Sequence, residues 1–379
     1  MISRTYIAAI ASLVGATVGV GMFTLPYVTM RSGILTVLAF FLVLGVIQHW
    51  LHKIYAEIVL STKEKHRLPG YAEKYLGPSS KKIIVTLITV ACYGSLLAYT
   101  IIGGDFLYQL LSPFFGGTVF IYTTLLLVIR SLIVLFGLRW ITRTEVVLTA
   151  GLVGAILVIA ALTAGSGSLA NITLFNPAHA ILPYGPVFFA ISGIIAVNDV
   201  CLILKKEKVK IKSALFWGIT ISISIMVIFT ILIASLSGSA TTADALSGLK
   251  PFVNEAVYSS LLLIGIMAIT TVYLAMAEAL EEVYMWDLKL PKNVAWLLVA
   301  VVPYLLYLLG AQDLTKVIAV SGAAIGGLLG ALTLTIALHV KKNPEQKSPL
   351  RSYLTPRLAH ALTLLFVFGL VYELWEIFG

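Results

Sequence analysis

Charged residues are scarce in this chain, and so are cysteines. Asp, Glu, Lys and Arg make up 11% of the 379 residues, against roughly 25% in soluble globular domains. The two cysteines, Cys92 and Cys201, both lie in apolar segments without metal-ligand spacing. The sequence therefore excludes a water-soluble domain, a disulfide-bonded scaffold and a cysteine metal centre.

The chain also lacks the patterns that carry enzyme chemistry. It has no phosphate-binding loop, no His and Glu at metal-ligand spacing, and no serine or cysteine beside a plausible base. Its formal charge is +9, but the Lys and Arg residues lie in short loops between apolar runs. There they set the orientation of a protein in a membrane. We therefore expect neither an enzyme nor a nucleic-acid-binding protein.

Long apolar runs are what the chain has in abundance. Hydrophobic residues make up 59% of it and its mean hydropathy is +1.00. A window of about 19 residues identifies eleven runs that are long enough to cross a bilayer. These runs are Thr5–Met30, Gly33–Leu60, Ser80–Leu111, Thr118–Leu138, Thr144–Ala164, Ala180–Leu204, Ile211–Leu236, Pro251–Trp286, Val294–Gly310, Leu314–Val340 and Pro356–Phe378. We predict an all-α integral membrane protein whose eleven transmembrane helices form one domain over residues 1–379.

The basic residues predict how these spans are oriented. With the N-terminus on the cytoplasmic side, 22 of the 26 Lys and Arg residues fall on that side, three fall on the other, and Arg130 lies within a span. Lys and Arg accumulate in cytoplasmic loops. We therefore expect a multi-pass protein of the plasma membrane with a cytoplasmic N-terminus and an extracellular C-terminus.

Two of the spans carry helix-breaking residues at corresponding places. The first contains the segment from Gly15 to Pro26, and the sixth contains the segment from Pro183 to Gly193. Broken helices five spans apart indicate an inverted repeat, with halves at 1–164 and 180–340 and an extra helix at 356–378. At such breaks, free N–H groups bind a carboxylate and free carbonyls bind an ammonium group. The pattern predicts an amino acid site, and close packing of glycines is the alternative for either break alone.

These segments resemble the amino acid/auxin permease family of the amino acid/polyamine/organocation superfamily, whose members share the LeuT-type fold. The resemblance rests on Gly15 to Pro26, Pro69 to Leu76, Tyr93 to Asp105 and Phe188 to Gly193. The first and third helices are similar to those of bacterial aromatic amino acid permeases and animal neutral amino acid transporters. The resemblance implies a LeuT-type 5+5 inverted repeat with broken first and sixth helices.

The resemblance also implies a set of substrate-binding residues at the two breaks and on the third helix. They are Ala16, Gly19, Val20, Gly21, Tyr99, Phe188, Phe189, Ala190 and Ser192. The backbone from Gly19 to Gly21 would hold the substrate carboxylate, and carbonyls beside Ala16 and from Phe189 to Ser192 would receive the ammonium group. Phe189 or its neighbour Phe188 matches the aromatic lid of the fold, and Tyr99 would face the site.

The fold operates with sodium, with protons or as an exchanger, and the resemblance favours sodium here. In sodium-driven relatives one ion lies between first-helix carbonyls, matching Gly15 and Val18, and two eighth-helix hydroxyls, matching Thr270 and Thr271. The fifth span contains no lysine, which some proton-coupled relatives use as a substitute cation. Hydroxyls that bond to carbonyls one turn back are the alternative reading of the two threonines. No other cofactor is expected.

Four charged residues, Asp105, Arg130, Asp199 and Glu278, lie within the predicted spans. Charges inside a membrane are costly and mark functional positions. Asp199 follows the sixth-helix break by about two turns, where it would latch an intracellular gate or relay protons. None of the four lies level with the expected site, which favours a neutral substrate.

We therefore predict a secondary active transporter that moves a neutral amino acid, aromatic ones included, across the lipid bilayer by alternating access. Its expected partners are the amino acid and the bilayer, and no protein partner is predicted. An amino-acid-binding sensor or receptor with the same fold and little transport is the alternative.

Overall fold

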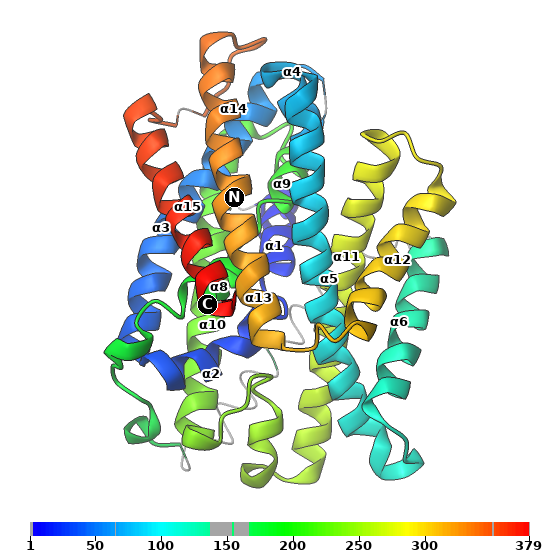
Figure 1. The fold of residues 1–379 in the computed structure, drawn as a ribbon. Helices are drawn as coiled ribbons and strands as arrows, with labels where there is room; N and C mark the ends of the chain where they lie inside the picture. The colour runs from blue at the N-terminus through cyan, green and yellow to red at the C-terminus, as the bar shows by residue number, and fades with distance from the viewer. Residues whose placement is uncertain (1–2, 65, 137–153, 155–166, 351, 379) are drawn as a thin grey trace.

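The chain folds into a bundle of helices (Figure 1). The structure is a computed structural model that describes residues 3–64, 66–136, 154, 167–350 and 352–378. Within these ranges six helices are long and apolar enough to cross a membrane, and one bent pair forms a seventh such span. Helices suit this sequence because in lipid every backbone N–H and C=O group has to be paired within its own segment. The predicted fifth span, Thr144–Ala164, lies outside the described residues except for residue 154.

The unbroken helices coincide with the predicted spans. They are α3 (Ile34–Ser61), α5 (Pro78–Phe115), α6 (Val119–Phe136), α10 (Ile211–Ser237), α11 (Glu255–Trp286), α12 (Lys292–Leu308) and α15 (Pro356–Phe378). The tenth span consists of α13 (Leu314–Ala323), the π-helical η6 (Ala324–Leu329) and α14 (Gly330–Lys342). Short 3-10 segments are η1 (Leu169–Asn171), η2 (Pro177–His179), η3 (Lys208–Lys210), η4 (Gly238–Ala240) and η5 (Ser247–Phe252).

The first and sixth spans are broken, as predicted. The first consists of α1 (Arg4–Thr17) and α2 (Gly21–Ser32), which meet at an angle of 56°. The sixth consists of α8 (Tyr184–Ala190) and α9 (Ala196–Ile203). The prolines lie outside both breaks, since Pro26 is inside α2 and Pro183 precedes α8. The breaks fall instead at the glycine-containing segments 18–20 and 191–195.

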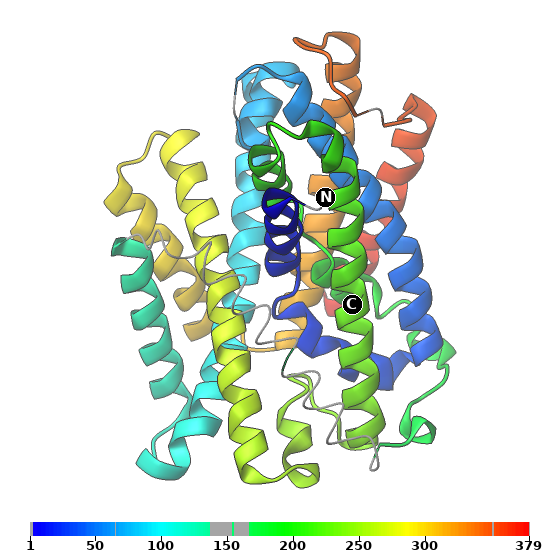
Figure 2. The ribbon, with the colours of Figure 1, turned by 180° about the vertical axis from the view of Figure 1, so that it is seen from behind.

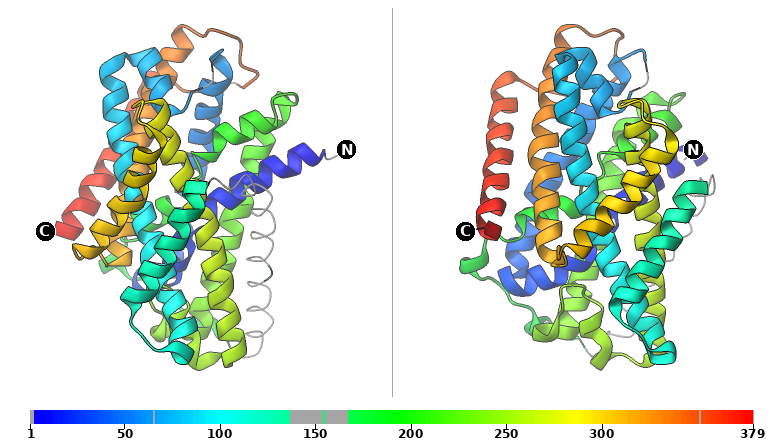
Figure 3. Two further views of the ribbon diagram at one scale, coloured as in Figure 1. Left: turned by 90° about the vertical axis from the view of Figure 1, so that its right-hand side faces the viewer. Right: turned by 45° about the vertical axis from the view of Figure 1, so that its right-hand side comes forward.

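The remaining helices surround these broken spans. In Figure 1, α6 and α12 lie on one side of α5 and α11, and α3, α14 and α15 lie on the other. The short helix α4 (Leu68–Leu76) packs against α5 and α14 at one end of the bundle, which we call the α4 end. Seen from behind in Figure 2, α1 lies near the middle of the molecule beside α10. Figure 3 shows that α1 runs obliquely and that its N-terminal end projects from the bundle.

Candidate functional site

The two helix breaks lie against each other. A Cβ atom added at Gly21 would lie 2.7 Å from Ala190 Cα and 2.9 Å from Phe189 Cδ1. At the other side of the breaks, a Cβ added at Gly193 would lie 2.3 Å from Thr17 Oγ1. Contacts of these lengths leave room for glycine alone, so the glycines at the breaks permit the close approach of the first and sixth spans.

The breaks leave backbone groups without partners. Among the described residues, no backbone hydrogen bond begins at the N–H groups of Gly19, Val20 or Gly21. The carbonyls of Ala16 and Val18 likewise accept no backbone hydrogen bond from the part of the chain that the structure describes. Free N–H groups at the start of a helix favour an anion, and free carbonyls favour a cation. The first break therefore offers both kinds of group within six residues.

The sixth-span break adds further carbonyls. The Phe189 carbonyl already accepts the Ser192 N–H at 3.2 Å. Over the described ranges, the carbonyls of Ala190 and Ser192 accept no backbone hydrogen bond. The free acceptors for an ammonium group at this break are therefore the carbonyls of Ala190 and Ser192, whereas the Phe189 carbonyl already has a donor.

A pocket lies at this meeting point. Eight of the nine residues implied by the resemblance line it: Ala16, Gly19, Val20, Gly21, Tyr99, Phe189, Ala190 and Ser192. Phe188 does not line it, because its ring packs between Tyr184 and Phe366, with ring centroids 5.9 and 5.8 Å away, and is 1% exposed. Of the two candidates for the aromatic lid, Phe189 alone faces the pocket.

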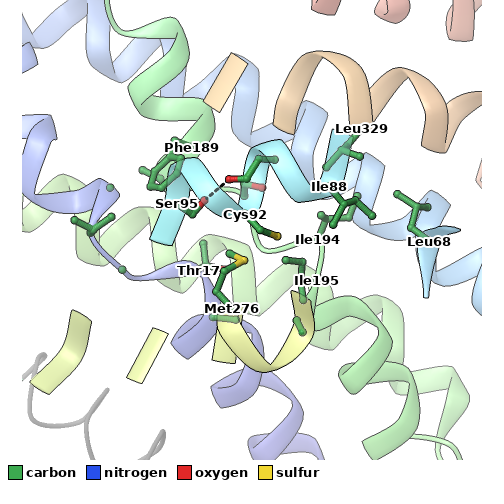
Figure 4. Close-up of a pocket in the computed structure, with 18 of the residues that line it drawn as sticks. Thr17, Leu68, Ile88, Cys92, Ser95, Phe189, Ile194, Ile195, Met276 and Leu329 are labelled. Carbon is green, nitrogen blue, oxygen red and sulfur yellow. Dashed lines mark hydrogen bonds between the residues drawn. The ribbon is translucent and has the colours of Figure 1, made fainter. Parts of the chain in front are cut away.

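Most of the remaining lining is apolar. Figure 4 shows Ile88, Cys92 and Ser95 of α5 together with Met276 of α11 around the pocket. The pocket contains about 910 Å³ of space outside protein atoms, including space open to solvent. Sequence reasoning missed Cys92 and Ser95, although they precede Tyr99 by seven and four residues. That spacing puts them on the same face of a helix as Tyr99, and it is the signal that would have found them.

A second pocket continues from the first toward the α4 end. The two share several lining residues, including Ala16, Ser192 and Arg67. Three carboxylates line the second pocket: Asp199, Glu278 and Glu282. The site is therefore accessible from the α4 end.

Arg67 stands between the two pockets and is paired with two of these carboxylates. Its Nη2 lies 3.0 Å from Glu282 Oε2 and 3.8 Å from Asp199 Oδ1, and its Nη1 donates to the Ile195 carbonyl at 3.4 Å. Burial lowers the pKa of Arg67, but Asp199 and Glu282 outweigh burial and raise it above its ordinary value. The side chain thus stays charged. Sequence reasoning identified Asp199 as a gate residue and missed Arg67.

A cluster of aromatic side chains begins just beyond the first-span break. The Phe23 ring of α2 packs edge-on against Phe106 of α5 and Phe229 of α10, with ring centroids 5.4 and 5.6 Å apart. All three side chains are buried. Phe23 is two residues beyond Gly21, which lines the pocket, so this buried cluster follows the pocket along α2.

Comparison with known proteins identifies the family of this chain. The model of the tryptophan/tyrosine permease family matches residues 3–376. The chain belongs to this family. The permease is therefore a transporter of amino acids and not an enzyme. This match is to the tryptophan/tyrosine permeases and does not specifically support the amino acid/auxin permease family of the resemblance. No curated protein matches the chain.

Solved structures of transporters share the fold of this permease. MhsT in complex with L-phenylalanine has a TM-score of 0.70 at 16% identity, covering 99% of both chains. Mhp1 in its inward-facing conformation has a TM-score of 0.71 at 13% identity, covering 98% of this chain and 90% of its own. The manganese transporter of Eremococcus coleocola scores 0.68 at 14% identity, covering 99% of this chain and 88% of its own. These similarities show the fold, which is the predicted LeuT-type fold.

Thr270, one of the predicted sodium ligands of the permease, does not face the first-span break. The Thr270 hydroxyl accepts hydrogen bonds from Arg130 of α6, at 3.1 Å from Nε and 2.9 Å from Nη2. Val272, by contrast, faces the first-span break, since its Cγ1 would lie 3.3 Å from a Cβ at Gly19. Residues two apart on a helix point about 200° apart, so Thr270 points away from Gly15 and Val18. Its assignment as a sodium ligand is wrong for this reason.

Thr271 is buried, and its hydroxyl donates to the Met267 carbonyl one turn back at 3.1 Å. This is the alternative bond considered for both threonines. A hydroxyl that donates one bond keeps its oxygen lone pairs for a cation. Thr271 is therefore the eighth-helix hydroxyl that is still able to bind an ion.

Asp105 joins a network at the end of the bundle opposite α4. Gln109 of α5 donates from Nε2 to Asp105 Oδ2 and to Ser247 Oγ, each at 2.7 Å. Ser247 in turn donates to Asp244 at 2.5 Å. These bonds tie the segment that contains η5 to α5. Glu278 is exposed at the opposite end, in the second pocket.

Proposed function

We propose that this permease is a secondary active transporter that moves a neutral amino acid, aromatic ones included, across the plasma membrane by alternating access, with sodium as the coupling ion. The observation that carries the proposal is the row of free N–H groups from Gly19 to Gly21. It faces the free carbonyls of Ala190 and Ser192 inside a largely apolar pocket. A zwitterionic amino acid matches these two sets of groups.

Substrate binding follows from this arrangement. The carboxylate accepts from the N–H groups of Gly19, Val20 and Gly21, and the ammonium group donates to the carbonyls of Ala16, Ala190 and Ser192. The side chain lies along the apolar lining on α5 and α11, beneath Phe189 and beside Tyr99. Arg67 is the charged residue that lines this pocket, and it is neutralised by Glu282 and Asp199. Among the described residues, the pocket lining thus offers no unpaired charge to a charged substrate side chain. This supports a substrate with a neutral side chain.

Alternating access uses the two ends of the pocket in turn. We assign the α4 end to the cytoplasm, in keeping with the distribution of Lys and Arg, so the second pocket lies on the cytoplasmic side of the site. Arg67, Asp199 and Glu282 form the inner gate, and Phe23 with Phe106 and Phe229 forms the outer cover. The two repeats, residues 1–164 and 180–340, supply the broken helices that rock against the other helices.

Sodium coupling would use the carbonyls of Gly15 and Val18 together with the hydroxyl of Thr271. The Val18 carbonyl accepts no backbone hydrogen bond from the described residues, and oxygen atoms of carbonyls and hydroxyls are suitable ligands for a hard cation. Thr270 is left out of this set because it binds Arg130. A bound ion would place a positive charge close to the substrate carboxylate.

The test is a thermal-shift screen of the purified permease against the twenty amino acids, each in sodium chloride and in choline chloride, followed by uptake into proteoliposomes. A ligand that binds the folded state raises the melting temperature. We expect sodium-dependent stabilisation by neutral aromatic amino acids and sodium-dependent uptake of the same ones. Stabilisation without uptake would favour the sensor, and no response to any amino acid would overturn the proposal.

A further inference from the structure

A glutamate on the last helix is buried inside the bundle. Glu373 of α15 is 2% exposed, whereas its neighbours Val371 and Trp375 on the same helix are exposed. Its Oε1 accepts the backbone N–H of Gly185 at 2.8 Å. Gly185 lies in the first turn of α8, the short helix that precedes the sixth-span break. A carboxylate on the extra helix thus contacts the broken span of the site.

Two glycines make this contact possible. A Cβ at Gly185 would lie 2.6 Å from Glu373 Oε1 and 2.7 Å from the Ala319 carbonyl oxygen of α13. On α15, a Cβ at Gly369 would lie 2.0 Å from Tyr184 Cζ. One turn before Gly369, the Phe366 ring packs edge-on against Phe188. The helix α8 therefore packs closely against both α13 and α15.

The contact bears directly on the pocket. The helix α8 ends with Phe189 and Ala190, which line it, and Gly185 lies about one turn before Phe189 on this seven-residue helix. A peptide N–H at the start of a helix has no acceptor within the helix. In a membrane such a group needs a partner from elsewhere in the protein. Glu373 supplies the acceptor that keeps the first turn of α8 in place.

We propose that Glu373 is a positioning residue for transport: by accepting the Gly185 N–H it fixes α8, and through α8 it fixes Phe189 and Ala190 in the substrate pocket. The eleventh helix, which lies outside both repeats, is then part of the support of the site and not an addition to it. The inference rests on the proposed transport function for its kinetic readout. It also makes a structural prediction that needs no substrate.

The kinetic experiment compares Glu373→Ala, Glu373→Gln and the lipid-facing control Val371→Ala in proteoliposomes. Loss of one buried acceptor is expected to raise the substrate KM of Glu373→Ala about tenfold. The ratio of KM values for aromatic and small amino acids should change as well, because Phe189 moves. Glutamine keeps an acceptor oxygen, so Glu373→Gln should stay close to wild type, as should Val371→Ala. A merely structural role would lower the amount of inserted protein and leave KM and the ratio unchanged.

The structural experiment measures hydrogen–deuterium exchange of residues 183–190 in the same three variants without substrate. Glu373→Ala should exchange faster there, whereas Glu373→Gln and Val371→Ala should match the wild type. Should Glu373→Ala fail to insert, Gly369→Ala tests the same contact by pushing Tyr184 away, and it should raise both exchange and KM. Wild-type exchange in Glu373→Ala, or equal defects in Glu373→Ala and Glu373→Gln, would overturn the inference. Absence of amino acid uptake by the wild type would overturn the proposed function instead.

Discussion

The Arg130 guanidinium and the Thr270 hydroxyl are joined by two hydrogen bonds, of 3.1 Å from Nε and 2.9 Å from Nη2, across α6 and α11. Arg130 is 1% exposed, and its Nη1 also donates to the Tyr99 carbonyl of α5 at 2.9 Å. Its guanidinium lies 5.1 Å from the centre of the Tyr273 ring. One buried cation therefore connects three helices directly behind the pocket-lining Tyr99. Thr270 is a structural partner of that cation.

We expect Thr270→Val to destabilise the permease in the absence of sodium. Valine has nearly the same shape but leaves two donors of a buried charged group without an acceptor, which costs about 2 kcal/mol. The measurement is the difference in free energy of unfolding between Thr270→Val and the wild type, in detergent and choline chloride. Thr271→Val is the matched control, because it removes a bond to a carbonyl one turn back and leaves no charged donor unpaired. Equal stability of the two variants would contradict the role of Thr270.

The sodium dependence of uptake should change in Thr271→Val and stay unchanged in Thr270→Val, which is the reverse of the effects expected on stability. Thr271→Val removes a proposed ion ligand, so the sodium concentration for half-maximal uptake should rise about tenfold, the effect of losing ~1.4 kcal/mol of ion binding. Thr270→Val should keep the wild-type sodium dependence in whatever protein is correctly folded. The measurement is uptake against sodium concentration at constant ionic strength. Unchanged sodium activation in Thr271→Val would remove this hydroxyl from the site.

The breaks could be predicted from the sequence because their cause is local. Glycines at Gly19, Gly21 and Gly193 interrupt otherwise continuous apolar runs, and the interruption is visible without any knowledge of packing. The same argument led to the inverted repeat, and the resemblance of these segments to a known family led to the LeuT-type fold.

The rotation of each helix about its axis could not be predicted in this way. The choice between Thr270 and Thr271, and between Phe188 and Phe189, depends on which side of a helix faces the pocket. Both α8 and α11 are apolar around most of their circumference, so they carry little of the alternation between polar and apolar faces that fixes rotation in soluble proteins. Arg67 was missed for a related reason. It lies in a loop, and its partners Asp199 and Glu282 are brought to it by tertiary packing alone.

Arg67 gives a prediction for the inner gate that uses a native cysteine as the probe. Cys92 lines the pocket, and Cys201 is removed by Cys201→Ala. In that background, Arg67→Ala should speed the reaction of Cys92 with a membrane-impermeant thiol reagent from the cytoplasmic side about fivefold, the effect of ~1 kcal/mol of partly exposed ion pairing.

A bound amino acid should protect Cys92 in the same experiment, because both occupy one pocket. Lys205→Ala is the matched control, since Lys205 is an exposed cation just after the end of α9. Equal rates in Arg67→Ala and Lys205→Ala would show that Arg67 does not restrict entry.

The contact of Gly21 with the Ala190 backbone gives the sharpest prediction for the site. Gly21→Ala adds a Cβ at 2.7 Å from the Ala190 backbone, which cannot move without separating the two breaks. Gly19→Ala adds one at 3.3 Å from the Val272 side chain and 3.5 Å from the Tyr99 hydroxyl, where side chains are able to shift. We expect Gly21→Ala to lower uptake by about fivefold to a hundredfold, since overpacking of this kind costs about 1–3 kcal/mol, and Gly19→Ala to lower it less. Both variants should reach the membrane in normal amounts. Uptake is measured per inserted molecule, and if Gly21→Ala transported as well as Gly19→Ala, the meeting of the two breaks would not be the place where substrate binds.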